Sequence, residues 1–181
     1  MAGPGDEAVL RPLHFAYVRE EVLLSGGTLN EGFERRQLRE ALEKQVVVMA
    51  VREQSGPREP DKACIHAVTA SVQAQTLEKS FAAGVPDDTF EMPGCGRPLA
   101  KAGTNAIASK VMQLGGVYTL RDERGRGLAA ALTAFLAESA ARKGFATVLF
   151  VNKKNAAAIA AYRRAGFTDS GKAYTIEYYG S

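Results

Sequence analysis

Two periods of hydrophobic residues run along the chain, and the change between them separates predicted helices from predicted strands. Apolar residues recur every three or four positions from Glu31 to Lys44, which predicts an amphipathic helix. A second helix with an apolar stripe begins at Leu128 and continues to about Lys143. A nearly unbroken apolar run from Val46 to Arg52 predicts a buried strand, and Ala106 to Leu120 predicts the central strand.

Shorter patterns predict the remaining elements. Proline, glycine and charged residues predict a loop from Glu53 to Lys62 and a long irregular connection from Phe81 to Leu99. We expect a further helix from Leu13 to Leu24 and strands at Ala8 to Pro12, Ile65 to Gln75, Thr147 to Val151, Phe167 to Ser170 and Ala173 to Tyr179. This alternation predicts one α/β domain over residues 1–181.

Composition narrows the class of protein. The 181 residues are 46% hydrophobic, which is ample for a folded core, and the net charge of +3 gives no reason to expect nucleic acid as a partner. The apolar runs are too short to span a bilayer and no secretory signal opens the sequence, so we expect no membrane partner. Cys64 and Cys95 are too few and too far apart for a zinc site. We therefore expect a cytoplasmic protein without a metal.

A glycine- and arginine-rich turn between the central strand and the Leu128 helix is the first candidate site. The helix start leaves its first backbone N–H groups unpaired and carries partial positive charge. Gly125 and Gly127 let that backbone approach a ligand closely, and Arg124 and Arg126 add forked donors. The sequence therefore predicts an anion site that suits a pyrophosphate.

Three phosphate-binding patterns could explain this turn. A nucleotide-triphosphate loop needs a lysine followed by Ser or Thr beside the glycines, and none is present. The dinucleotide pattern is matched formally by Gly125-x-Gly127-x-x-Ala130, but the next strand ends in Asn152 without the ribose-binding carboxylate. The third pattern is Arg124-x-x-Gly127-x-Ala129, of the form [R/Q]-x-x-G-x-[G/A].

A second candidate segment runs from Asn155 to Phe167. Asn155 and Tyr162 are seven residues apart, about two helical turns, so their side chains point to one face of a predicted helix. The alanines between them keep that helix thin, and Gly166 is placed to end it. Asn155 could also be a plain helix cap, and Tyr162 a half-buried core aromatic.

The order of strand, anion turn, helix, strand, Asn155 helix, Tyr162 and Gly166-Phe167 resembles the GNAT superfamily of acyl-CoA-dependent N-acetyltransferases. The resemblance covers about Gly115 to Phe167. It implies a central mixed, mostly antiparallel, twisted sheet flanked by helices on both faces and split between its fourth and fifth strands. Residues 1–104 would then form the acceptor side and residues 105–181 the coenzyme A-binding core.

The resemblance also implies roles for individual residues. Tyr162 would lie beside the thioester sulfur of acetyl-CoA. Gly115 and Gly116 would mark a bulge that lets strand amides bind the pantetheine arm, although a packing role for this pair is equally open. Coenzyme A would be held by Val117, Tyr118, Thr119, Arg124, Gly125, Arg126, Gly127, Leu128, Ala129, Asn155 and Ala158.

The reaction that we expect is direct acetyl transfer to the amine of a small molecule or peptide, with Tyr162 as donor to the leaving thiolate. His66 is the candidate base, because it titrates in the right range, although a structural role for a lone strand histidine is the commoner one. Lesser candidates are Glu177, Asp122, Glu91 and Tyr118, and a water relay is as good as any.

Two other functions stay open at this point. One is a coenzyme A-binding sensor or degenerate acetyltransferase, which would keep the anion turn without a working acceptor pocket. The other is a dinucleotide-binding oxidoreductase. The sequence also leaves open the acceptor, the acyl chain length and whether the chain forms a homodimer.

Overall fold

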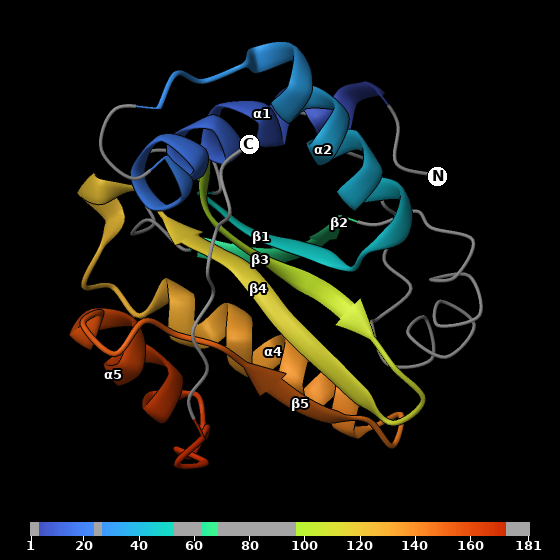
Figure 1. Ribbon diagram of the computed structural model, residues 1–181, viewed down its shortest axis with the longest axis vertical. Coiled ribbons are helices and arrows are strands. Elements are labelled where there is room, and N and C mark those ends of the chain that lie inside the picture. Colours follow the sequence, from blue (N-terminus) through green and yellow to red (C-terminus); the bar gives the residue numbers. More distant parts are fainter. Residues whose placement is uncertain (1–3, 24–26, 53–62, 69–96, 173–181) are drawn as a thin grey trace, which may run out of the picture.

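The computed structural model describes residues 4–23, 27–52, 63–68 and 97–172 (Figure 1). The elements in chain order are α1 (Pro4–Tyr17), η1 (Val18–Val22), α2 (Glu31–Lys44), β1 (Val47–Arg52), β2 (Ala63–Val68), β3 (Pro98–Ile107), β4 (Val111–Thr119), η2 (Arg121–Glu123), α4 (Leu128–Ala141), β5 (Ala146–Leu149) and α5 (Ala156–Arg164). Of these, η1 is a π-helix and η2 a 3-10 helix.

The five described strands form one sheet in the order β2-β1-β3-β4-β5. The pairs β1–β2, β1–β3 and β3–β4 are antiparallel, and β4–β5 is parallel. β5 pairs with β4 only from Val111 to Leu114, whereas β4 continues to Thr119. The structure therefore confirms the expected mixed, mostly antiparallel sheet that is split between its fourth and fifth strands.

Helices cover both faces of the sheet, as expected (Figure 1). Alternate residues of β1 point to opposite faces, so Met49 joins the core beneath α1 and α2, and Val48 joins the core against α4. Leu10 of α1 is fully buried in the first core, and Leu132 of α4 in the second. α5 packs beside α4, which brings it to the open end of β4.

The predicted helix from Glu31 to Lys44 has the observed bounds of α2 because its local signals agree. Asn30 caps the helix by accepting a hydrogen bond from the Phe33 N–H at 3.0 Å. Leu38 and Leu42, one turn apart, form its buried face. The predicted strand from Val46 agrees with β1 to within one residue.

The predicted strand at Ala8 to Pro12 is wrong, because these residues lie inside α1. Leu10 and Leu13, three residues apart, are both buried in the core that α1 shares with α2. Glu7 adds ion pairs to Arg35 at 3.0 Å and Arg39 at 2.8 Å, which join the two helices. These contacts between helices override the short alternating pattern that predicted a strand.

The predicted central strand from Ala106 to Leu120 is also wrong in its first part. It contains the end of β3, a turn in which the Ala108 N–H donates to the Val111 carbonyl at 2.8 Å, and then β4. No glycine or proline marks this turn in the sequence. Residues 98 and 99, which were expected in the irregular connection, belong to β3.

Of the two strands predicted at the end of the chain, one is wrong and the other stays a prediction. Phe167 to Ser170 is not a strand; the Asp169 side chain accepts a hydrogen bond from the Gly171 N–H at 2.8 Å and favours a turn there. The predicted strand from Ala173 to Tyr179 lies outside the described residues. β2 ends at Val68, and the rest of the predicted Ile65 to Gln75 strand also lies outside them.

Candidate active site

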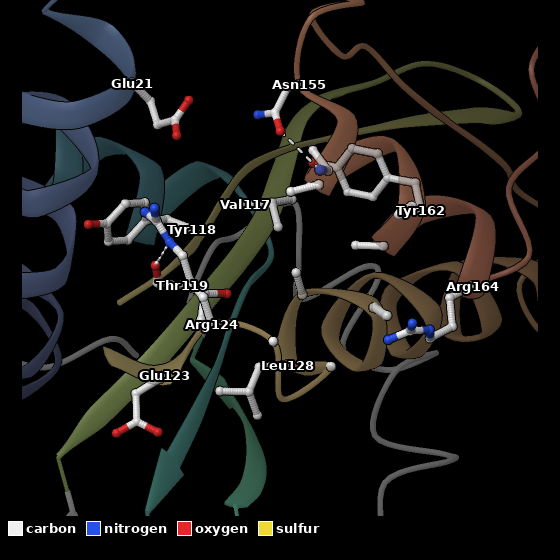
Figure 2. Close-up of a pocket in the computed structure, with 18 residues that line it drawn as sticks. Glu21, Val117, Tyr118, Thr119, Glu123, Arg124, Leu128, Asn155, Tyr162 and Arg164 are labelled. Carbon is white, nitrogen blue, oxygen red and sulfur yellow. Dashed lines mark hydrogen bonds between the residues drawn. The ribbon is translucent and has the colours of Figure 1, made fainter. Parts of the chain in front are cut away.

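A pocket of about 370 Å³ opens where β4 continues beyond the end of β5 (Figure 2). Its walls come from η1, the end of β4, the glycine turn, the start of α4 and one face of α5. The volume lies in the range of small-molecule sites. Eleven of the thirteen predicted site residues line it, namely Val117, Tyr118, Thr119, Arg124, Gly125, Gly127, Leu128, Ala129, Asn155, Ala158 and Tyr162.

The glycine turn presents bare backbone to this pocket. Gly125 has a φ of 79° and Gly127 a φ of 82°, in the left-handed region that favours glycine. Nothing lies within 4 Å of a Cβ built on either residue, so the space beside the turn is open. Gly127 caps α4, and the N–H groups of the first helical turn have no acceptor within the helix. The predicted anion-binding geometry is therefore present.

The two arginines of the turn are held by carboxylates. Arg124 donates to Glu20 at 2.7 Å and to the Thr119 carbonyl oxygen at 3.1 Å. Arg126 pairs with the buried carboxylate of Glu123 and does not line the pocket. These guanidinium groups thus brace the turn, and the backbone N–H groups are the donors that it presents for an anion.

Glu20 of η1 is the centre of this bracing. Its carboxylate accepts hydrogen bonds from the Tyr118 hydroxyl at 2.7 Å and from Arg121 Nε at 3.1 Å, in addition to Arg124. Burial alone would raise the pKa of Glu20, but these hydrogen bonds and the arginine charges outweigh it and lower the pKa. Burial and the bond to Glu20 raise the pKa of Tyr118 to about 12, so this phenol stays protonated and is a poor candidate base.

Asn155 has the structural role that the sequence left open. Its Oδ1 accepts a hydrogen bond from the Ala158 N–H at 3.0 Å and caps α5 (Figure 2). Within the described residues its Nδ2 has no hydrogen-bond partner, and the residue lines the pocket. Contact between Asn155 and coenzyme A stays a prediction, and it is compatible with the capping role because the cap uses only Oδ1.

Tyr162 lines the same pocket from α5, as the spacing from Asn155 predicts (Figure 2). Its ring meets that of Phe167 edge to face, with centroids 6.4 Å apart. Burial, followed by the charges of Glu21 and Tyr17, raises the pKa of Tyr162 to about 12. The phenol is therefore protonated at neutral pH, so it can donate a hydrogen bond but cannot act as a base.

The predicted bulge in β4 is confirmed. Between the pairs Lys101–Tyr118 and Gly103–Gly115, β4 contains one residue more than β3. Gly116, inside the bulge, has a φ of 58°, and its carbonyl oxygen accepts a hydrogen bond from Lys101 Nζ.

Thr119 closes β4 with a feature that the sequence does not reveal. Its Oγ1 is buried and has no hydrogen-bond partner among the described residues. A buried polar atom of this kind calls for a partner. Because Thr119 lines the pocket, a bound ligand or a water molecule can supply one.

Among the candidate bases that the structure describes, Tyr118 alone lines the pocket. His66 lies on β2, opposite Met49, and β1 and β3 separate it from β4, which places the two backbones about 14 Å apart. Asp122 pairs with Arg97 at 2.8 Å and does not line the pocket. Glu91 and Glu177 lie outside the described residues.

Sequence reasoning missed seven of the residues that line the pocket, three of them charged (Glu21, Glu123 and Arg164), and it also missed Lys101. Glu21 and Arg164 line the pocket, and Lys101 contacts its bulged strand. The spacing gave no reason to expect Arg164 there, since residues two apart on a helix do not share a face and Arg164 lies two residues after Tyr162. Nothing in the sequence joins Glu21 or Lys101 to β4.

Comparison with known proteins identifies the same region. A model of the acetyltransferase (GNAT) family matches residues 65–167, more than half of the chain. This range contains every pocket residue except Glu21. None of the curated proteins matches the sequence.

Two solved structures share the fold over nearly the whole chain. One, described as a probable acetyltransferase, has a TM-score of 0.64 and 17% identity, and the match covers 99% of this chain and 97% of the other. The other, an acetyltransferase of Trypanosoma brucei, has a TM-score of 0.51 and 15% identity, with 95% and 94% covered. At these identities the likeness concerns the fold alone.

Two kinds of feature are absent from the described residues. No helix there is both long and apolar enough to cross a bilayer. In the same parts of the chain, no three His, Cys, Asp or Glu side chains gather in a way that could hold a metal ion.

Proposed function

Because the chain belongs to the acetyltransferase (GNAT) family, we propose that it transfers an acetyl group from acetyl-CoA to a primary amine of a small molecule or peptide. Acetyl-CoA is here a substrate, and both substrates would be bound together before transfer. Membership in this family argues against a dinucleotide site at the glycine turn. The sequence also lacks the carboxylate that would bind the ribose in such a site.

One observation carries the proposal. The free N–H groups at the start of α4 and the phenol of Tyr162 line a single pocket, beside the stretch of β4 that β5 leaves unpaired. A diphosphate suits the helix start, and an extended amide-bearing arm suits an open strand edge. A ligand that combines both groups would end near Tyr162.

The chemistry follows from the residues at that end. The amine attacks the thioester carbonyl, and an N–H of bulged β4 near Val117 stabilises the developing oxyanion. The C–S bond then breaks, the electron pair leaves with sulfur as a thiolate, and the nitrogen, positively charged after its attack, loses a proton to water. Tyr162, with a pKa of about 12, is a much weaker acid than a thiol of pKa about 8.5, so it donates a hydrogen bond to the thiolate and keeps its proton.

Binding and turnover test the proposal separately. Acetyl-CoA should raise the melting temperature of the protein, whereas NAD and NADP should not, because only a ligand that binds the folded state stabilises it. Free thiol should then appear from acetyl-CoA only when an amine is added. Acetyl-CoA binding without thiol release from a broad amine panel would favour the sensor; no binding at all would refute the site.

A further inference from the structure

Two neighbouring glutamates of η1 have opposite surroundings. Glu20 accepts hydrogen bonds from Tyr118, Arg121 and Arg124. Glu21 is exposed and has neither an ion pair nor a hydrogen bond within the described part of the chain. The nearby cations are already engaged, since both arginines bind Glu20. Both oxygens of the Glu21 carboxylate are therefore available to accept hydrogen bonds from a ligand.

Glu21 faces the pocket across from Tyr162. Figure 2 shows its carboxylate on the opposite side of the cavity from α5, and the residue lines the pocket wall. Its charge raises the pKa of Tyr162 and of Tyr17, in both cases after the larger effect of burial. The carboxylate thus acts electrostatically on the phenol that lies at the reacting end of the site.

Both glutamates lie on a single π-helical turn, η1. The Leu23 N–H donates to the Val18 carbonyl at 2.9 Å, a bond between residues five apart that widens this turn. Tyr17, four residues before Glu21, lies on the adjoining part of the same helix face. Such π-helical turns are frequent at functional sites.

The pocket wall carries charge of opposite sign at two places. The start of α4 and the Arg164 side chain give one part of the wall positive character. Glu21 gives negative character to the part beyond Tyr162, away from Arg164 in the view of Figure 2. A polyanion and a cation would therefore be drawn to different ends, with the phenol between them.

We propose that Glu21 is the binding subsite for a cationic acceptor, and that the acceptor is an aliphatic amine that arrives as its ammonium ion. This inference rests on the proposed acetyl transfer and adds the chemical class of the acceptor. Aliphatic amines are protonated at neutral pH, with pKa values of about 10, whereas arylamines are neutral there. Glu21 would thus favour the first class over the second.

The test compares wild type with Glu21→Gln in a thiol-release assay with an aliphatic amine series and an arylamine. Glu43→Gln, on the exposed side of α2, is the matched control. Glu21→Gln should raise the KM for the aliphatic amines about 10- to 100-fold, as expected for loss of a charge-assisted hydrogen bond. The Kd for acetyl-CoA and the KM for the arylamine should change less than about twofold.

Ionic strength gives a second measurement that a structural role would not move. The KM of wild type for the aliphatic amine should rise with salt, and that of Glu21→Gln should not. Thiol release by wild type with an unchanged KM in Glu21→Gln would overturn this inference and leave acetyl transfer intact. Absence of thiol release by wild type with every amine would overturn both.

Discussion

Lys101 donates a hydrogen bond from its Nζ to the carbonyl oxygen of Gly116, 3.1 Å away, in the bulge of β4. The same Nζ lies 4.3 Å from the ring centroid of Tyr17. Lys101 is only 7% exposed, and burial lowers its pKa to about 8. Because N–H and C=O point in opposite directions in a trans peptide, this bond fixes the Val117 N–H so that it points away from Lys101.

Replacing Lys101 should therefore reduce turnover more than donor binding. We expect Lys101→Met to lower kcat about tenfold through a misdirected Val117 N–H, with the Kd for acetyl-CoA within about threefold of wild type. Lys143→Met is the control, since the pKa of Lys143 is also lowered to about 8, by burial and by Arg142, at a position outside the pocket. Equal kcat values for Lys101→Met and wild type would contradict the role of Lys101.

The same lysine should leave a mark on stability. Folded Lys101 loses its proton near pH 8, whereas the unfolded residue keeps it to about pH 10.5, so the unfolded state binds more protons between these values. Its contribution to the free energy of unfolding should rise with pH there, by about 3 kcal/mol in full. Denaturant unfolding from pH 8 to 10 should show a smaller rise for Lys101→Met than for wild type. Parallel curves would refute the depressed pKa.

Tyr162→Phe tests the donor to the leaving thiolate. The variant keeps the ring and its contact with Phe167 but removes the hydroxyl, so we expect kcat to fall about 10- to 100-fold. The Kd for acetyl-CoA should stay within about twofold, because the bond forms only as the thiolate develops. Isothermal titration and steady-state kinetics measure the two quantities. A fall in affinity with unchanged kcat would assign the phenol to binding instead.

Gly127 and Gly144 form a matched pair for the anion turn. Both have positive φ, 82° and 76°, and neither has an atom within 4 Å of an added Cβ. Substitution by Ala should cost each protein about 1 kcal/mol of stability from backbone strain. Only Gly127→Ala should weaken acetyl-CoA binding, by about tenfold or more, because only Gly127 lines the pocket. Equal affinities in the two variants would count against the diphosphate site.

Glu20→Gln tests the brace beneath the pocket, with Glu21→Gln as its neighbouring control. Losing the charge that holds Tyr118 and Arg124 should lower the free energy of unfolding by about 1 to 2 kcal/mol, while Glu21→Gln should change it by less than about 0.5. The pKa of Glu20 is lowered in the folded state, so its contribution is present above about pH 4.5 and lost as the pH falls further. Acid unfolding curves of wild type and Glu20→Gln should therefore converge.

Local signals explain what could be predicted. The α2 helix has a capping Asn30 and a clear apolar face, and the glycine turn needs residues that tolerate positive φ. The Asn155 to Tyr162 spacing places both side chains on one helix face without any knowledge of the rest of the chain. Each of these features depends on residues that are close in sequence.

Contacts between distant residues explain what could not be predicted. Glu20 meets Arg124 across 104 positions, and Lys101 meets a carbonyl group that only a β4 bulge turns toward it. The segment from Ala8 to Pro12 is helical because Leu10, together with Leu13 after it, packs into the core under α1, and the short alternating pattern does not indicate this burial. Hydrophobic periodicity therefore cannot predict which side chains of η1 line the pocket.

The early end of β5 leaves the outer edge of β4 without a neighbouring strand after Leu114, as far as the described residues extend. Amide hydrogens along that edge should exchange quickly with solvent in the free protein and slowly once an extended ligand lies against them. The occupied protein would then be the more rigid one. An edge of this kind also invites a strand from another molecule, so prolonged storage without ligand should favour self-association.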